Sequence, residues 1–229
     1  SVISTGDELV SSLSKERLNG QIFDANRPML LSLLNSNYLE TIDMGIVKDK
    51  RKDLANKYDE CLSKSDVVIS SGGASDGIED HTQNALKDIG AKCIVWQLAM
   101  KPGKPMAIGL LGKKIIFCLP GNPVAAFVCT KLLIKPLIIK LAGGVNLNPL
   151  SIKLPSGFVH NKKTGRAEYL RAKIINEDAK SFIMLHGRKG AGVISSLTGA
   201  DGIVEIPMEY ESVVKGDLLN FFPFDHRGL

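Results

Sequence analysis

Two short runs made only of apolar residues constrain the fold of this chain more than any other feature. Val67-Val68-Ile69 and Ile115-Ile116-Phe117 show no polar alternation, which is typical of central strands in a sheet covered on both faces. Each run leads through a glycine-containing turn into a segment with helical periodicity. The sequence therefore predicts an α/β fold with a parallel sheet and crossover helices, arranged in three layers.

The alternation of strands and helices extends to about Leu141, and after Gly143-Gly144 the pattern changes. Helical periodicity disappears and short alternating segments follow, separated by prolines and asparagines. We expect an α/β domain over residues 1–145 and a small all-β, barrel-like domain over residues 146–229. The predicted helices are 26–36, 51–63, 81–89 and 124–141; the predicted strands are 41–47, 66–70, 92–97, 106–110 and 114–119, then 169–175, 181–185, 193–196, 202–207 and 218–222, and Ser1–Ser4 resembles the end of a further strand.

Composition narrows the class of partner. The 29 basic and 24 acidic residues give a formal charge of +5 and are interspersed, which favours anionic ligands mildly and argues against nucleic acid. The most apolar stretch, 124–141, contains three lysines and a proline, so we expect no membrane contact. The four cysteines, at positions 61, 93, 118 and 129, lack the spacing of metal ligands, and we interpret them as buried, reduced thiols of a cytoplasmic protein.

Three glycine-containing turns follow predicted strands, at the edge where open α/β sheets bind ligands. They are residues 4–8, 70–77 and 119–123. Because glycine has no Cβ, backbone amides in such turns can approach phosphates closely. Each turn also has a purely structural interpretation: Asp80 is suited to cap the next helix, and Asn122 with Pro123 forms a standard helix start.

A fourth segment, Met100–Pro105, carries two lysines between two prolines. Solvated loop lysines are the usual case, but prolines reduce the flexibility that makes lysines ineffective at fixed sites. The segment is suited to present Lys101 and Lys104 to a phosphate or to an oxyanion such as molybdate.

Taken in order, these motifs resemble the molybdopterin molybdenumtransferase family, which includes MoeA and the gephyrin E domain. The resemblance covers the first 141 residues and rests on the motifs at 4–8, 24–27, 45–49, 71–77, 101–105 and 119–123. In the β-rich part, Arg166, Glu168 and Arg171 are similar to the family's Arg-x-x-Phe/Tyr-x-Arg segment. The family's N-terminal pair of domains has no counterpart here, so we expect the chain by itself to fold but to be inactive.

The resemblance implies a Mg²⁺-assisted reaction in which adenylylated molybdopterin is hydrolysed, AMP is released and molybdate is inserted. It also implies a homodimer in the full-length protein and contact with the molybdopterin adenylyltransferase. The residues that it assigns to catalysis are Glu8, Asp49, Asp80 and Lys101, of which Asp49 and Asp80 also bind the metal. Those that it assigns to the pterin substrate and molybdate are Gly72, Gly73, Ser75, Lys104, Pro120, Gly121, Asn122, Pro123 and Arg171.

Several positions depart from the family pattern and keep two alternatives open. Gln97 replaces a common lysine, while Ala125 and Ala191 replace serines. Each lost contact weakens binding by about 1 kcal/mol if relatives make it. One alternative is an adenylyltransferase of the MogA class, which has no barrel domain; the other is a non-catalytic scaffolding module of the same fold.

Overall fold

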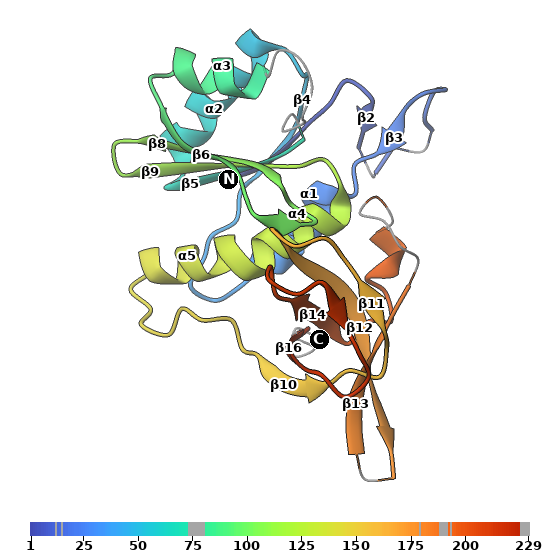
Figure 1. Ribbon diagram of the computed structural model, residues 1–229. Coiled ribbons are helices and arrows are strands. Elements are labelled where there is room, and N and C mark those ends of the chain that lie inside the picture. The colour runs from blue at the N-terminus through green and yellow to red at the C-terminus, as the bar shows by residue number, and fades with distance from the viewer. Residues whose placement is uncertain are drawn as a thin grey trace.

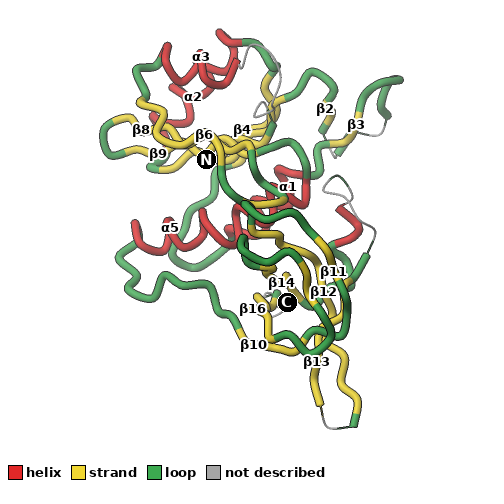
Figure 2. The backbone as a smooth tube through the Cα atoms, viewed as in Figure 1, coloured by secondary structure: helices red, strands yellow, loops and turns green. Residues whose placement is uncertain are grey.

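The computed structural model describes residues 1–11, 13–14, 16–72, 81–178, 180–187, 192 and 194–224. An α/β part and a smaller β part make up the chain, and helices lie between the two (Figure 1). Figure 2 shows the strands of the two parts as separate groups. The predicted fold class, a three-layer α/β domain followed by a barrel-like domain, is confirmed.

The sheet of the α/β part carries the two apolar runs at its centre. In spatial order it consists of β4 (Asp43–Val47), β1 (Val2–Thr5), β5 (Val67–Ser71), β9 (Lys114–Leu119), β8 (Pro105–Leu111) and β6 (Lys92–Gln97). The first four strands pair in parallel. Val68, Ile69, Ile116 and Phe117 are at most 2% exposed. Both runs are therefore covered on both faces, as the absence of polar alternation predicted.

One strand corrects the prediction of a wholly parallel sheet. β8 runs antiparallel to both β9 and β6. Only Gly112 and Lys113 connect β8 to β9. Such a short connection can join antiparallel strands but is far too short for a crossover. Since β6 and β9 are both antiparallel to β8, β6 points the same way as the four parallel strands.

Helices cover both faces of the sheet, which explains the burial of the central strands (Figure 1). One face packs against α2 (Arg51–Lys64) and α3 (His81–Asp88) through a cluster that includes Leu54, Tyr58 and Leu86. The opposite face packs against α1 (Asn26–Leu34) and the long helical segment that follows β9. This arrangement buries an apolar stripe of each helix on the sheet.

The predicted helix 124–141 is continuous but changes its winding. It comprises α4 (Pro123–Cys129), a π-helical turn η1 (Thr130–Ile134) and α5 (Lys135–Leu141). Pro136 lies at the start of α5. A proline inside a helix has no N–H to donate and its ring collides with the carbonyl four residues earlier, so a wider turn before it relieves the strain.

The β part forms a curled sheet in the order β10 (Ile152–Pro155), β16 (Leu218–Pro223), β14 (Gly202–Ile206), β12 (Ala167–Glu177) and β13 (Lys180–Leu185). Its two ends approach each other, because Gly157 N donates to the Ile183 carbonyl oxygen over 2.9 Å. The interior is apolar, with Ile206 and Phe221 fully buried. Two short pairs accompany the sheets: β11 (His160–Asn161) with β15 (Ser212–Val213), and β2 (Leu9–Val10) with β3 (Ile22–Phe23).

One predicted strand of the β part is wrong. Residues 194–196 form a 3₁₀ turn, η2 (Ile194–Ser196), in which Leu197 N donates to the Ile194 carbonyl oxygen. The short strands β10, β11 and β15 were not predicted, because two to four residues carry too little alternation to separate a strand from a loop. Of the cysteines, Cys61, Cys118 and Cys129 are buried as predicted, but Cys93 on the edge strand β6 is exposed.

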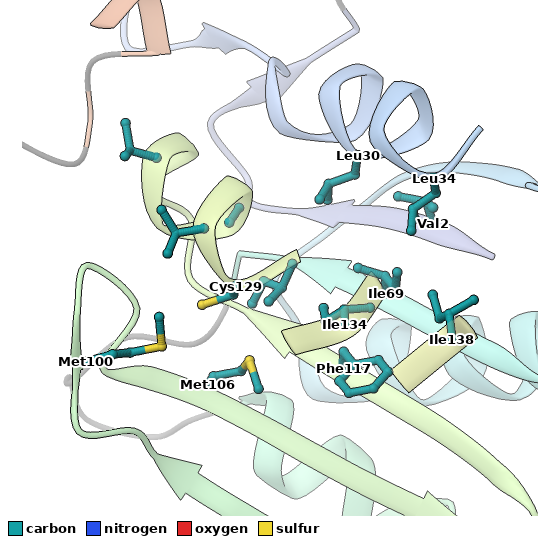
Figure 3. Packing of buried hydrophobic residues seen from close by; sticks show 14 of the residues in the cluster. Val2, Leu30, Leu34, Ile69, Met100, Met106, Phe117, Cys129, Ile134 and Ile138 are labelled. Atoms are coloured by element: carbon teal, nitrogen blue, oxygen red, sulfur yellow. The ribbon is translucent and has the colours of Figure 1, made fainter. Parts of the chain in front are cut away.

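The two parts share an apolar cluster. Strand β7 (Met100–Lys101) leaves the α/β part and pairs in parallel with β12. Met100 packs with Cys129 of α4 in the cluster that also contains Ile203 of β14 (Figure 3). The rings of Phe127 and Phe224 meet edge to face at 5.0 Å. The predicted boundary at residue 145 stays a prediction; α5 ends at Leu141 and β10 begins at Ile152.

Candidate functional site

The turns and loops that the sequence singled out leave the same edge of the first sheet. The carboxyl ends of β1, β4, β5, β9 and β6 all lie there, because these strands point the same way. We call this edge, with the segments 6–8, 48–50, 71–72, 98–104 and 120–123, the carboxyl rim. Six strands at about 4.8 Å spacing make it about 24 Å long. The rim is thus long enough to contact an extended ligand along its length.

Two glycine turns touch at the middle of the rim. Gly72 N donates to the Leu119 carbonyl oxygen at 3.1 Å. A Cβ built on Gly121 would lie 3.8 Å from the Gly72 Cα. Gly72 has a φ of +103°, in the region that only glycine adopts readily. Backbone from β5 and from β9 therefore meets here without any side chain between.

Asn26, the first residue of α1, ties these two turns together. Its amide nitrogen donates to Ser71 Oγ at 2.7 Å and to the Gly121 carbonyl oxygen at 2.8 Å. Two residues earlier, Asp24 is buried, and its carboxylate accepts hydrogen bonds from Ser4 Oγ at 2.9 Å and from Arg27 Nε at 2.9 Å. The family motif at 24–27 includes Asn26, but sequence reasoning gave it no role; a buried polar network of this kind becomes visible only in the fold.

Acidic residues gather at the β4 end of the rim. Asp49 N donates to Asp7 Oδ1 at 3.3 Å, and the Asp49 Oδ1 atom is buried with no hydrogen-bond partner among the described residues. Burial raises the pKa of Asp49; the negative charges of Asp7 and Glu8 act in the same direction, whereas His81 opposes them. Glu8 folds back over Gly6, where a Cβ would lie within 2.9 Å of its carboxyl group. This end of the rim favours a cation.

Four positions that the sequence singled out lie outside the described residues. They are the candidate site residues Gly73, Ser75 and Asp80, and the departure Ala191. Within the described ranges, no group of three or more His, Cys, Asp or Glu side chains is placed to hold a metal ion. The predicted metal pair of Asp49 and Asp80 thus stays a prediction.

Lys101 lies in the loop that follows β6 and is paired with the β part. Its Nζ donates to Glu168 Oε1 at 2.9 Å, and Glu168 Oε2 lies 2.9 Å from His160 Nε2. Burial favours the neutral form of Glu168, but hydrogen bonds from Lys101 and His160 outweigh it and lower the pKa of this carboxyl group. Lys101 and Asp49 follow β6 and β4, which are the two edge strands of the first sheet.

The remaining predicted residues surround the start of α4. Pro120 is buried, Pro123 begins the helix, and Asn122 is its N-cap residue, although its side chain makes no capping hydrogen bond. Asn122 Oδ1 instead lies 3.6 Å from a Cβ built on Gly192 of the β part. Sequence reasoning expected a capping side chain here, and the structure shows Asn122 at the cap position without that hydrogen bond.

Lys104 and Arg171 complete the predicted set. The Lys104 carbonyl oxygen accepts from Leu98 N at 2.9 Å, which closes the 98–104 loop. Arg171 is buried on β12, and burial lowers its pKa. Since strand side chains alternate, Arg171 shares a face with Tyr169, which packs against the cluster shared with α4. Of the departures, Gln97 is exposed at the end of β6 and Ala125 is buried in the first turn of α4.

The fold and the rim together define a class: a ligand-binding α/β domain with backbone turns at one sheet edge, joined to a barrel-like β domain. The family described as "Probable molybdopterin binding domain" matches residues 1–140, and the "MoeA C-terminal region (domain IV)" matches residues 153–224. The chain belongs to this molybdopterin-binding family.

Relatives agree with this assignment along nearly the whole chain. A molybdopterin molybdenumtransferase of Haemophilus influenzae is 34% identical over 227 residues, covering 98% of this chain and 56% of the relative. The molybdenum cofactor synthesis protein cinnamon of Drosophila melanogaster is 31% identical, covering 90% of this chain and 34% of the relative. A crystal structure of the molybdopterin biosynthesis MoeA protein from Pyrococcus horikosii aligns with a TM-score of 0.81 at 31% identity, covering 98% of this chain and 54% of that one.

The chain spans about half the length of the curated relatives that it matches. In the part of the chain that the structure describes, no helix is both long and apolar enough to cross a bilayer.

Proposed function

We propose that this chain forms part of a molybdopterin molybdenumtransferase, which inserts molybdate into adenylylated molybdopterin and releases AMP. The observation that carries the proposal is the meeting of the Gly72 and Gly121 turns, held by Asn26, at the carboxyl rim. A turn without side chains at the ends of parallel strands lets a phosphate-containing ligand approach the backbone closely, and Gly121 is exposed there. The similarity to molybdenumtransferases over 98% of the chain supports the choice of substrate.

Different residues of the rim suit different parts of such a ligand. Gly72, Gly121 and Asn122 would contact the phosphoanhydride, and Pro120 and Pro123 would stiffen this turn. The resemblance assigns Gly73 and Ser75, outside the described residues, to the same substrate. Lys101 and Lys104 supply positive charge to the phosphate or to molybdate. Arg171 reaches the ligand from the β part. Water attacks the pterin-side phosphorus of the phosphoanhydride and AMP leaves with the bridging oxygen. The two dithiolene thiols then bind molybdate, and one oxo ligand leaves with the two thiol protons as water.

Mg²⁺ fits the acidic end of the rim. The Asp49 Oδ1 atom is buried and has no hydrogen-bond partner among the described residues. Together with the raised pKa of this carboxyl group, that indicates a site that gains from a nearby cation. Carboxylate oxygens are the ligands that Mg²⁺ prefers, so Asp49 would hold it together with Asp80. When bound, the ion would neutralise charge on the phosphates as the anhydride is cleaved. Glu8, beside Asp49, would orient the attacking water.

Of the two alternatives, the adenylyltransferase is disfavoured by the β domain, since residues 153–224 match the MoeA C-terminal region. The scaffolding alternative rests on Gln97, Ala125 and the Ala191 departure, which remove polar groups and leave the fold intact. We further propose that the full-length protein is a cytoplasmic homodimer that receives its substrate from the adenylyltransferase.

The test is AMP release from adenylylated molybdopterin, followed by mass spectrometry, with molybdate and Mg²⁺ present. We expect turnover by the full-length polypeptide and none by the 229-residue chain alone. Lys101→Ala and Asp49→Asn should each reduce kcat by about 100-fold or more, because each removes a charge that acts in the transition state. Full activity of both variants would refute the assignment of the site, and absence of AMP release from the wild type would favour the scaffolding alternative.

A further inference from the structure

Lys101 and Glu168 come from different domains but are direct neighbours across a strand pair. β7 and β12 pair in parallel with Lys101 opposite Glu168. The two side chains form an ion pair at 2.9 Å. Among the described residues, the strand that carries Lys101 pairs with β12 of the β domain.

Glu168 is fixed on every side. Its side chain is 9% exposed, and each carboxylate oxygen has its own partner: Lys101 Nζ on Oε1 and His160 Nε2 on Oε2. A buried carboxylate with both oxygens engaged has little freedom to rotate. The low exposure also makes the ion pair stronger than one in open solvent.

Lys101, by contrast, has capacity left for a ligand. Its side chain is 58% exposed although its nitrogen is held. An ammonium group has three N–H donors, and the ion pair with Glu168 uses one. A lysine on a free loop loses most of its rotamer freedom on binding an anion; Lys101 has given up part of that freedom already.

We propose that Glu168 is a positioning residue, which holds the Lys101 ammonium at the carboxyl rim so that its remaining donors meet the anionic substrate. The inference rests on the proposed function, because it takes Lys101 to act on that substrate. It gives the β domain a part in the reaction: this domain supplies the counter-charge that orients a lysine of the α/β domain.

The competing explanation is that the pair merely joins the two domains. The junction, however, has other strong contacts. Ala167 N donates to the Ala99 carbonyl oxygen at 3.0 Å, Met100 is buried in the shared cluster, and Phe127 packs on Phe224. Removing the Glu168 carboxylate therefore leaves the backbone pairing and the apolar junction in place, so the two explanations predict different results.

The experiment is a double-mutant cycle on the full-length protein, with Lys101→Ala, Glu168→Ala and both together. Glu168→Gln keeps the hydrogen-bond acceptor without the charge. The matched control is Glu205→Gln: Glu205 is a half-buried carboxylate of the same sheet, on β14, bonded to Tyr169 and Asn220. Two readouts are taken: kcat and KM for AMP release, and the acylation rate of Lys101 by a succinimidyl ester, with the exposed Lys113 as internal reference.

We expect Glu168→Ala to lower kcat by about tenfold or more, with a smaller change in KM. The double variant should be no slower than Lys101→Ala within about threefold, since a residue that acts through the lysine has nothing further to lose. Glu168→Gln should recover part of the loss, and Glu205→Gln should match the wild type. Lys101 acylation should rise about threefold or more in Glu168→Ala, because a charged hydrogen bond no longer holds the amine.

If the losses of kcat in Lys101→Ala and Glu168→Ala multiply in the double variant, the inference is overturned while the proposed function stays intact. An unchanged Lys101 acylation rate in Glu168→Ala would also overturn it, and this readout needs no turnover. If the wild type releases no AMP, the proposed function fails on that result alone.

Discussion

Replacing Gly72 by alanine should destabilise the fold more than any other single methyl group added at the rim. A Cβ built at Gly72 would lie 3.1 Å from the Thr5 carbonyl carbon and closer still to its oxygen. That oxygen belongs to the backbone of β1 and cannot rotate away. The substitution therefore forces neighbouring strands apart at the centre of the sheet.

The magnitude has two parts. A φ of +103° costs a non-glycine residue about 1–3 kcal/mol. Displacing the Thr5 backbone adds to this, so we expect a loss of at least about 3 kcal/mol in the free energy of unfolding. For a chain of this size, that loss lowers the melting temperature by about 6–12 °C.

The matched control is Gly112→Ala in the turn between β8 and β9. Gly112 also has a positive φ, +59°, but a Cβ there meets nothing within 4 Å. It should cost only about 1–2 kcal/mol, the conformational part alone. Urea unfolding followed by circular dichroism measures both variants. A Gly72→Ala loss no larger than that of Gly112→Ala would show that close approach of the β1 backbone does not constrain this turn.

Other residues of the rim and core give three further predictions. Asp49→Asn should raise the free energy of unfolding at pH 7, because an ionised carboxyl group whose pKa is raised by folding destabilises the folded state. The gain in urea midpoint should disappear as the pH falls toward 4. A gain that stays constant with pH would contradict this prediction. Asn26→Ala should lower the free energy of unfolding in urea by about 1–3 kcal/mol, because the Gly121 carbonyl oxygen loses the donor that Asn26 provides. The control Asn161→Ala, at an exposed position, should leave this free energy nearly unchanged. A thiol reagent added to the native protein should modify the exposed Cys93 rapidly and Cys129 only on unfolding. Burial raises the pKa of Cys129 to about 12, which keeps this thiol protonated and unreactive. Fast labelling of Cys129 would refute its buried placement.

Much of the fold could be predicted from the sequence, because the patterns that indicate helices and strands are local. The helices α1, α2 and α3 begin at or next to their predicted first residues, since each amphipathic segment follows a turn. The direction of β8 was missed although Gly112-Lys113 is a hairpin-length connection. The 3₁₀ turn at 194–196 was mistaken for a strand, because three residues cannot distinguish the two periodicities.

For the site, sequence motifs indicated residues but not their partners. The role of Asn26 depends on Ser71 and Gly121, which are 45 and 95 residues away. The ion pair of Lys101 with Glu168 joins positions 67 residues apart. Such contacts leave no spacing pattern in a single sequence, because the chain between them is free to vary in length and path.

The sequence by itself determined the class of fold, the two-part organisation and the loops that carry the candidate site. Apolar runs, helical periodicity and glycine turns act over a few residues, so a single chain records them directly. Only the tertiary structure decided which of those loops touch, that Asn26 joins two of them, and that Lys101 is held by the β domain. The physical reason is that strand order and domain packing bring distant residues together through burial, and burial is a property of the folded chain as a whole.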